Sequence, residues 1–176
     1  GTLITMSDGT EKLIEDVKLG DVVTSYDVKA GEKVFATVFE LESPMREGYY
    51  NIKLIEGEIN VTNEHPFYVK KSNGEIGWAA IDDVAAEKDL VISELSGVDV
   101  SVLKIGDSLY TLDGKWIEIE NISYHEGEIK TYNLKTVDKY NKFFANEFLV
   151  HNKDGGGEGG CTNECTSGAT RKTCVT

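Results

Sequence analysis

The pair His151-Asn152 has a specific reaction open to it. The side-chain amide nitrogen of Asn152 can attack the residue's own backbone carbonyl, which closes a five-membered succinimide and expels the amine of Lys153. In a free chain the step is slow, because the amide is a poor nucleophile and the amine a poor leaving group. A fold that holds Asn152 in a near-attack geometry lowers this barrier. The neighbouring His151 imidazole can donate a proton to the leaving nitrogen or a hydrogen bond to the developing oxyanion. Taken alone, the pair is better interpreted as an edge histidine and a turn asparagine, so the reaction needs further support from the rest of the chain.

A second pair of chemically capable residues, Thr62 and His65, follows the strand-like run 58–61. A hydroxyl and an imidazole at this spacing can both bind one peptide unit. His65 could protonate the amide nitrogen of that unit, and Thr62 could fix the orientation of the unit. Twisting and protonating a peptide reduces its resonance stabilisation and eases acyl transfer. The alternative is an ordinary turn in which Pro66 enters the next strand. We assign no role to His125, which reads as a solvated turn residue.

Short β-strands must position these residues. β-branched and aromatic side chains fill the intervals between turns, and no stretch keeps a helical apolar period for three turns. Residues 14–19 and 81–86 could each form one helical turn. The sequence therefore predicts an all-β domain. Turn signals occur at Asp8-Gly9, Gly20-Asp21, Ala30-Gly31, Glu47-Gly48, Glu56-Gly57, Asn73-Gly74, Gly106-Asp107, Asp113-Gly114 and Glu126-Gly127.

An internal repeat organises these strands. Residues 17–27 align with residues 103–113, because the sequence Lys-x-Gly-Asp and its apolar flanks recur. Later landmarks keep the same order, as in the Tyr-Asn-apolar-Lys runs 50–53 and 132–135. Short strands with Gly turns can look alike by chance, but ordered matches favour two copies of one β-unit related by a pseudo-twofold axis. Such an axis would place equivalent loops on one side of the molecule.

The composition changes abruptly after residue 152. We predict one domain over 1–152, a Gly-rich linker over 153–160, and a disordered tail over 161–176 that belongs to the downstream flanking segment. The tail has almost no large apolar side chain and suggests a piece of a disulfide-rich segment from a secreted or cell-surface host protein. A zinc site would need a fourth ligand and other spacing, so we expect no metal. The tail holds all three cysteines, Cys161, Cys165 and Cys174.

Composition and charge exclude several classes of protein. With 176 residues the chain can bury a sizeable core as one domain. Lys plus Arg total 18 and Asp plus Glu total 31, giving a net charge of −13. This argues against a nucleic-acid partner and against an anionic membrane surface. No apolar run is long enough to span a membrane. The start at Gly1, with no initiator Met, reads as a cut or processed end.

Three blocks of the sequence resemble Hint domains, the self-processing modules of inteins, bacterial intein-like proteins and hedgehog proteins. The resemblance covers essentially residues 1–152, and it implies a horseshoe-like all-β fold with internal pseudo-twofold symmetry. The length leaves no room for a homing endonuclease, so the chain is most similar to the mini-intein and bacterial intein-like types. The three blocks are 1–9 with 14–23, the Thr-x-x-His motif at 62–65, and 131–134 running through 142–152.

The resemblance also implies roles for individual residues. Thr62 and His65 would activate the N-terminal scissile peptide bond. His151 would assist at the other end, where Asn152 would cyclise and break the bond to Lys153. The substrate would be the chain's own flanking segments, and we expect a monomer that needs no cofactor.

Four positions depart from the family pattern. Asn133 stands where many inteins have an Asp that couples the steps, and Tyr140 lies near the position where many inteins have a second His. The usual Cys nucleophile would precede Gly1 and is absent, so an N-terminal acyl shift and splicing require an upstream Cys or Ser. Splicing also needs Cys, Ser or Thr after the terminal Asn, and Lys153 has neither hydroxyl nor thiol. We therefore expect cleavage without efficient ligation.

Two other functions stand beside autoprocessing. A non-catalytic β-rich spacer or interaction module of a secreted protein would leave the bond after Asn152 intact, and His65 and His151 would not face each other. Cholesterol transfer, as in hedgehog processing, would need a sterol-binding extension. The Gly-rich, polar tail does not resemble one.

Overall fold

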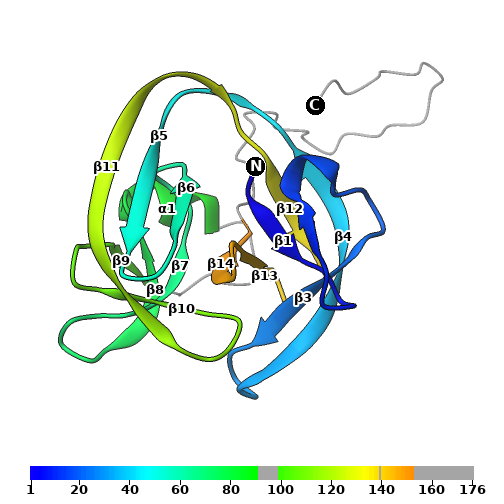
Figure 1. Ribbon diagram of the computed structural model, residues 1–176, viewed down its shortest axis with the longest axis horizontal. Coiled ribbons are helices and arrows are strands. Elements are labelled where there is room, and N and C mark those ends of the chain that lie inside the picture. Colours follow the sequence, from blue (N-terminus) through cyan, green and yellow to red (C-terminus); the bar gives the residue numbers. More distant parts are fainter. Residues whose placement is uncertain (91–98, 139, 153–176) are drawn as a thin grey trace, which may run out of the picture.

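The computed structural model describes residues 1–90, 99–138 and 140–152, and within them the chain is almost entirely β (Figure 1). The predicted linker, 153–160, and the predicted tail, 161–176, lie outside the described residues. The elements are β1 (Leu3–Thr5), β2 (Glu11–Leu13), a 3-10 turn (Ile14–Asp16), β3 (Val22–Asp27), β4 (Glu32–Glu42), β5 (Met45–Leu54), β6 (Glu58–Val61), β7 (Phe67–Lys70), β8 (Ile76–Ala80), α1 (Asp83–Leu90), β9 (Val100–Val102), β10 (Ser108–Tyr110), β11 (Trp116–Lys130), β12 (Asn133–Val137), β13 (Lys142–Ala145) and β14 (Phe148–His151).

The strands form two sheets that curl into a horseshoe. The larger sheet runs β2-β1-β13-β14-β7-β10-β11-β5-β6, with β8 on β7 and β9 on β8, and the smaller runs β12-β4-β3. The chain passes from one sheet to the other along its long strands. β5 follows β4 in the sequence but pairs with β11 in the larger sheet, and β12 follows β11 but pairs with β4 in the smaller sheet. Figure 1 shows the β13–β14 hairpin between the two flanks. The all-β architecture expected from the sequence is confirmed.

The two Gly-Asp turns of the predicted repeat adopt the same conformation. Gly20 has φ +87° and Gly106 has φ +90°, the left-handed region that glycine enters at little cost. The Gly20 N–H donates to the Val38 carbonyl at 2.9 Å, and the Gly106 N–H donates to the Ile119 carbonyl at 3.0 Å. Each turn is thus tied in the same way to the long strand that follows it, so at these turns the sequence repeat is also a structural one.

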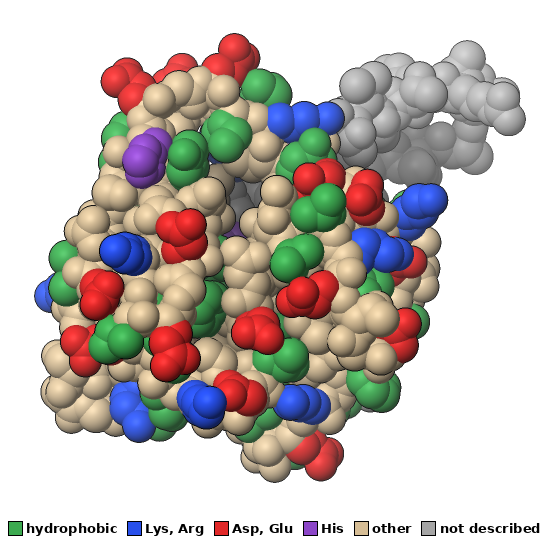
Figure 2. All heavy atoms as spheres, viewed as in Figure 1, with side chains coloured by type: hydrophobic (Ala, Val, Ile, Leu, Met, Phe, Trp, Pro, Cys, Tyr) green, Lys and Arg blue, Asp and Glu red, His purple; other side chains and the backbone are tan. Residues whose placement is uncertain are grey.

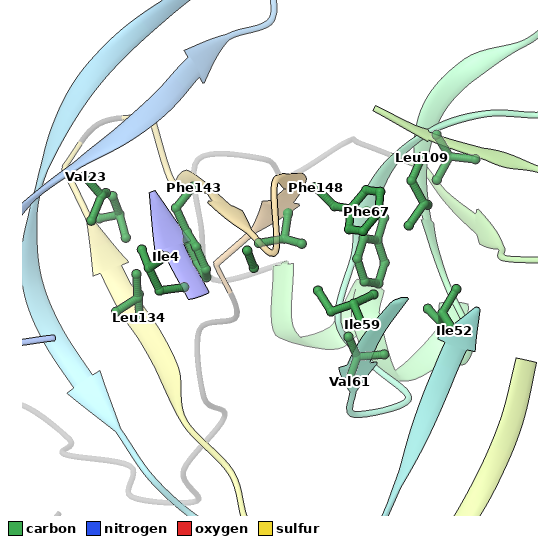
Figure 3. Close-up of a cluster of buried hydrophobic side chains, with 14 of the residues drawn as sticks. Ile4, Val23, Ile52, Ile59, Val61, Phe67, Leu109, Leu134, Phe143 and Phe148 are labelled. Atoms are coloured by element: carbon green, nitrogen blue, oxygen red, sulfur yellow. The ribbon is translucent and has the colours of Figure 1, made fainter. Parts of the chain in front are cut away.

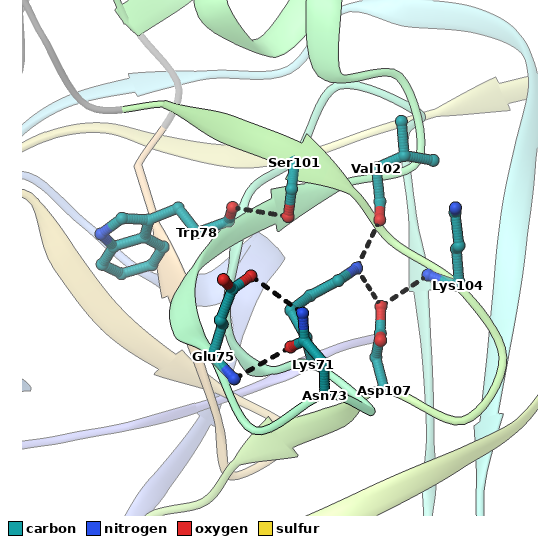
Figure 4. Close-up of polar contacts among 8 residues, drawn as sticks. All are labelled: Lys71, Asn73, Glu75, Trp78, Ser101, Val102, Lys104 and Asp107. Atoms are coloured by element: carbon teal, nitrogen blue, oxygen red, sulfur yellow. Dashed lines mark hydrogen bonds and ion pairs between the residues drawn. The ribbon is translucent and has the colours of Figure 1, made fainter.

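The same symmetry extends to one carboxylate in each turn. Asp21 accepts from the Lys12 ammonium at 2.8 Å, and Asp107 accepts from the Lys71 ammonium at 2.5 Å. Each carboxylate also accepts a backbone N–H three residues earlier, at 2.9 Å in both turns. The copies differ in burial, because the side chain of Asp107 is 2% exposed and that of Asp21 is 23% exposed. Lys71 also donates to the Val102 carbonyl at 2.7 Å (Figure 4).

The β13–β14 hairpin separates two apolar clusters. Its strands pair Phe143 with Val150 and Phe144 with Leu149. Because side chains alternate along a strand, the first pair packs into one cluster and the second pair into the other. The larger cluster includes Ile4, Val23, Ile52, Ile59, Val61, Phe67, Leu109, Leu134, Phe143 and Phe148 (Figure 3). The smaller contains Trp78, Ala80, Ala86, Val100, Phe144 and Leu149.

Both expected helical turns exist, with different extents. The first is the 3-10 turn Ile14–Asp16. The second is the helix α1, which begins at Asp83 and continues to Leu90. Asp82 caps it by accepting the Ala85 N–H at 2.9 Å, which explains why it starts later than the predicted 81–86 turn. No helix among the described residues is long and apolar enough to cross a membrane.

Candidate active site

A cavity of about 530 Å³ lies between the two halves and receives the start of the chain (Figure 2). Gly1, Thr62, His65 and Asn133 line it together with residues of β5, β6, β11 and β13. The α-amino group of Gly1 is 3.9 Å from a carboxylate oxygen of Glu15. The structure therefore brings the predicted Thr-x-x-His pair to the N-terminal end of the domain.

The turn after β6 positions Thr62 and His65. The His65 N–H donates to the Thr62 carbonyl at 3.4 Å, which folds the two half-buried side chains into one tight turn. The His65 ring packs edge-on against Phe67 and Phe143, with ring centroids 6.2 Å and 6.4 Å away. These aromatic neighbours belong to the larger apolar cluster, so the cavity wall behind the imidazole is rigid and apolar.

Glu64 is a buried residue of this turn that was not predicted as part of the site. One of its carboxylate oxygens lies 3.1 Å from the Arg46 guanidinium, and Arg46 lines the same cavity. The Glu64 side chain is 8% exposed. A carboxylate at this depth is stable only when paired, so the ion pair anchors the Thr62–His65 turn to β5. The signal in the sequence that points to Glu64 is its charge, because it stands between the Thr and the His of the Thr-x-x-His motif.

Asn133, which stands where many inteins have an Asp, lines the cavity. Its side-chain amide donates to a carboxylate oxygen of Glu42 at 3.0 Å, and both residues line the cavity. Tyr140 is half-buried against the larger apolar cluster. His125 is exposed and stacks on Tyr49 with centroids 5.0 Å apart.

His151 and Asn152 do not line this cavity and are 1% and 2% exposed. The Asn152 backbone N–H donates to the Asn141 carbonyl at 2.8 Å. The side-chain nitrogen of Asn152 donates to the Lys135 carbonyl at 2.5 Å and lies 3.4 Å from the amide oxygen of Asn141. Nδ1 of His151 lies 2.6 Å from the Asn152 carbonyl oxygen. Lys135 and Asn141 were not predicted from the sequence. The β13–β14 hairpin places Asn141 next to Asn152, and Lys135 comes from β12, which pairs with β4.

These contacts define the chemistry that the pair can perform. A carbonyl oxygen only accepts, so Nδ1 of His151 carries the hydrogen and donates it to the Asn152 carbonyl. Burial, more than any charge, lowers the pKa of His151 from 6.5 to about 3, so the imidazole is neutral at pH 7. Its Nε2 is buried without a hydrogen-bond partner among the described residues. His151 can therefore polarise the carbonyl, but it holds no spare proton for the leaving amine.

The two imidazoles of the predicted site do not share one cavity, which is the arrangement expected for the non-catalytic spacer module. His65 packs against Phe143 on one face of the β13–β14 hairpin. His151 packs against Trp78 on the other face, with ring centroids 5.3 Å apart. The alternation of side chains along β14 causes this separation. The segments still touch, because the His151 N–H donates to the Pro66 carbonyl at 3.0 Å. The charge of His65 also contributes to the lowered pKa of His151.

No protein-family model and no curated protein sequence matches the chain. Solved structures do match it. The bacterial intein-like domain from Clostridium thermocellum is 27% identical, with 86% of this chain and 95% of that chain covered and a TM-score of 0.65. The gp41-1 intein is 25% identical, with 86% and 94% covered and a TM-score of 0.56. The DnaB intein from Synechocystis sp. PCC 6803 is 19% identical, with 86% and 94% covered and a TM-score of 0.66. The chain therefore has the Hint fold and is similar to a bacterial intein-like domain and to inteins.

Proposed function

We propose that this domain processes its own chain by cleaving the peptide bond after Asn152 through asparagine cyclisation. The observation that carries the proposal is the set of hydrogen bonds around Asn152. Its amide nitrogen is held by the Lys135 carbonyl at 2.5 Å, and its carbonyl oxygen faces the His151 donor at 2.6 Å. The likeness to a bacterial intein-like domain and to inteins supports the same function.

The step balances within the chain. The Asn152 side-chain nitrogen forms a bond to the Asn152 carbonyl carbon and loses a proton. The bond from that carbon to the Lys153 nitrogen breaks, and the Lys153 amine gains a proton. Lys135 and Asn141 accept hydrogen bonds from the attacking nitrogen, which orients it and increases its electron density. His151 stabilises the oxyanion that forms between attack and expulsion.

The N-terminal half of the reaction depends on what precedes Gly1. Thr62 and His65 would bind and strain the upstream peptide bond, and the cavity that they line with Gly1 supports this role. An acyl shift there, and splicing, require an upstream Cys or Ser nucleophile. Because Lys153 offers neither hydroxyl nor thiol, we expect cleavage to dominate over ligation. Every group in these steps belongs to the chain or its flanks, so no cofactor is invoked.

Mass spectrometry of the full chain over time tests the proposal. Cyclisation releases residues 153–176 and leaves a product ending at Asn152 that is lighter by one water than the product of hydrolysis. Asn152→Ala should remain intact, and Asn121→Ala, which changes an exposed asparagine on β11, should cleave like the unmodified chain. An unmodified chain that stays intact on long incubation would instead support the non-catalytic spacer.

A further inference from the structure

Lys142 is a half-buried lysine that the proposed reaction does not use. It lies on β13 directly opposite His151 in the β13–β14 pairing. Its ammonium donates to the Tyr140 carbonyl at 2.6 Å and lies 5.9 Å from the centroid of the Trp78 ring. Burial lowers the pKa of Lys142. The negative charge of Asp27 raises this pKa, and the positive charge of Lys29 lowers it further. A lysine at this depth has lost hydration that its contacts must replace.

We propose that Lys142 is a positioning residue for cyclisation after Asn152. This inference rests on the proposed function and adds a residue to it. Lys142 would have two effects. It would stabilise the turn that binds the Asn152 side chain, and it would hold the Trp78 ring in contact with His151.

The first place is the turn formed by Tyr140 and Asn141. Asn141 has φ +53°, in the left-handed region that asparagine tolerates better than most residues with a side chain. In that conformation its carbonyl accepts the Asn152 N–H at 2.8 Å, and its side-chain oxygen lies 3.4 Å from the attacking nitrogen. The Lys142 ammonium binds the carbonyl of the preceding residue, Tyr140. Without that charge-assisted bond the turn could change its conformation and release Asn152.

The second place is the stack of Trp78 and His151. The two rings meet edge to face, at an interplanar angle of 87°. Lys142 and His151 are paired residues and so share the face of the hairpin that Trp78 covers. The ammonium can therefore hold the indole through a cation–π contact while the indole fixes the imidazole. Lys142 and His65 are the charged groups that act on His151, and both disfavour the imidazolium.

A lysine lying over an indole can also serve packing alone, and the chain contains a matched example. Lys70 lies 5.2 Å from the centroid of Trp116, on the β7–β10–β11 part of the larger sheet. Lys70→Met removes the same type of contact without touching the turn before β13 or His151. It therefore separates a general cost of losing a cation–π contact from a specific effect on cyclisation.

The experiment compares Lys142→Met, Lys142→Arg and Lys70→Met in the full chain, with cleavage after Asn152 followed by mass spectrometry. We expect Lys142→Met to cleave about tenfold more slowly, as the loss of one charge-assisted hydrogen bond predicts. Lys142→Arg should retain most of the rate, because a guanidinium can also donate to a carbonyl and stack on an indole. Lys70→Met should cleave at the unmodified rate. Thermal melts verify that each variant is folded, and Lys142→Gln replaces Lys142→Met if that variant does not fold.

A second measurement addresses position directly. In the uncleavable Asn152→Ala chain, nitrogen NMR of His151 should show hydrogen on Nδ1, and Lys142→Met should introduce the other tautomer or raise the pKa of His151. Equal cleavage rates or an unchanged His151 spectrum would overturn the role of Lys142 and leave the proposed function standing. An unmodified chain that never cleaves would overturn the proposed function, and this inference with it.

Discussion

Replacing His151 with phenylalanine removes the hydrogen bond that faces the scissile carbonyl while keeping a ring against Trp78. The bond joins Nδ1 to the Asn152 carbonyl oxygen at 2.6 Å in a site where His151 is 1% exposed. Removing one preorganised oxyanion donor from a buried site slows a reaction by about 100- to 1,000-fold. We expect a loss of this size for His151→Phe.

The assay is the time course of release of residues 153–176 by mass spectrometry. His125→Phe is the matched control, because that histidine is exposed and contacts Tyr49 and the Ser123 hydroxyl on the surface of the sheet. A thermal melt verifies folding, since the larger ring could cost about 1–3 kcal/mol in a packed site. Cleavage by folded His151→Phe within a few-fold of the unmodified rate would refute the role assigned to the hydrogen bond.

The pH dependence gives an independent test of the same site. Because the pKa of His151 is lowered from 6.5 to about 3, the imidazole stays neutral as the pH rises through 6.5. The cleavage rate should therefore not fall in that range, as it would if an imidazolium donated the proton. The unfolded chain binds a proton between pH 6.5 and 3 that folded His151 does not. This residue thus destabilises the fold as the pH falls through that window, by at most about 1.4 kcal/mol per pH unit. His151→Phe should lack this contribution in urea melts at pH 4 and 7.

Two further predictions concern the turn before β13 and the repeated turns. Asn141→Gly removes the side-chain oxygen near Asn152 but suits the backbone at φ +53°, so cleavage should slow about threefold to tenfold without loss of thermal stability; an unchanged rate would show that the carbonyl of this residue suffices. Asp107→Asn should lower the free energy of unfolding, measured in urea, by about 3 kcal/mol or more. The variant leaves the Lys71 ammonium without its negatively charged partner at a position that is 2% exposed. The equivalent Asp21→Asn should cost about 1 kcal/mol or less at a side chain that is 23% exposed, and equal costs would contradict the importance of burial.

Much of the fold could be predicted from local patterns. Turn dipeptides and β-branched runs indicated an all-β domain, and the repeated Lys-x-Gly-Asp sequence identified two turns with the same hydrogen bonds. These features are readable because turns depend on residues that are close in sequence. The helix α1 was predicted too short, since its extent depends on the Asp82 cap and on packing against β8 and β9.

The candidate site, too, could be predicted only in part from the sequence. The order of residues alone predicted Thr62, His65, His151 and Asn152 as site residues, because the members of each pair lie within a few positions of each other. It could not identify Lys135 and Asn141 as partners of the Asn152 side chain, nor the ion pair that anchors the Thr62–His65 turn.

Residue types and local spacing are enough to predict which groups could react and that short strands carry them. The acceptors around Asn152, and the burial that keeps the imidazole of His151 neutral, become visible only in the folded chain. The tertiary structure also decided that His65 and His151 lie on opposite faces of one hairpin. The physical reason is that hydrogen-bond partners and dielectric environment depend on strand pairings between distant residues, whereas reactivity and turn preference belong to the residues themselves.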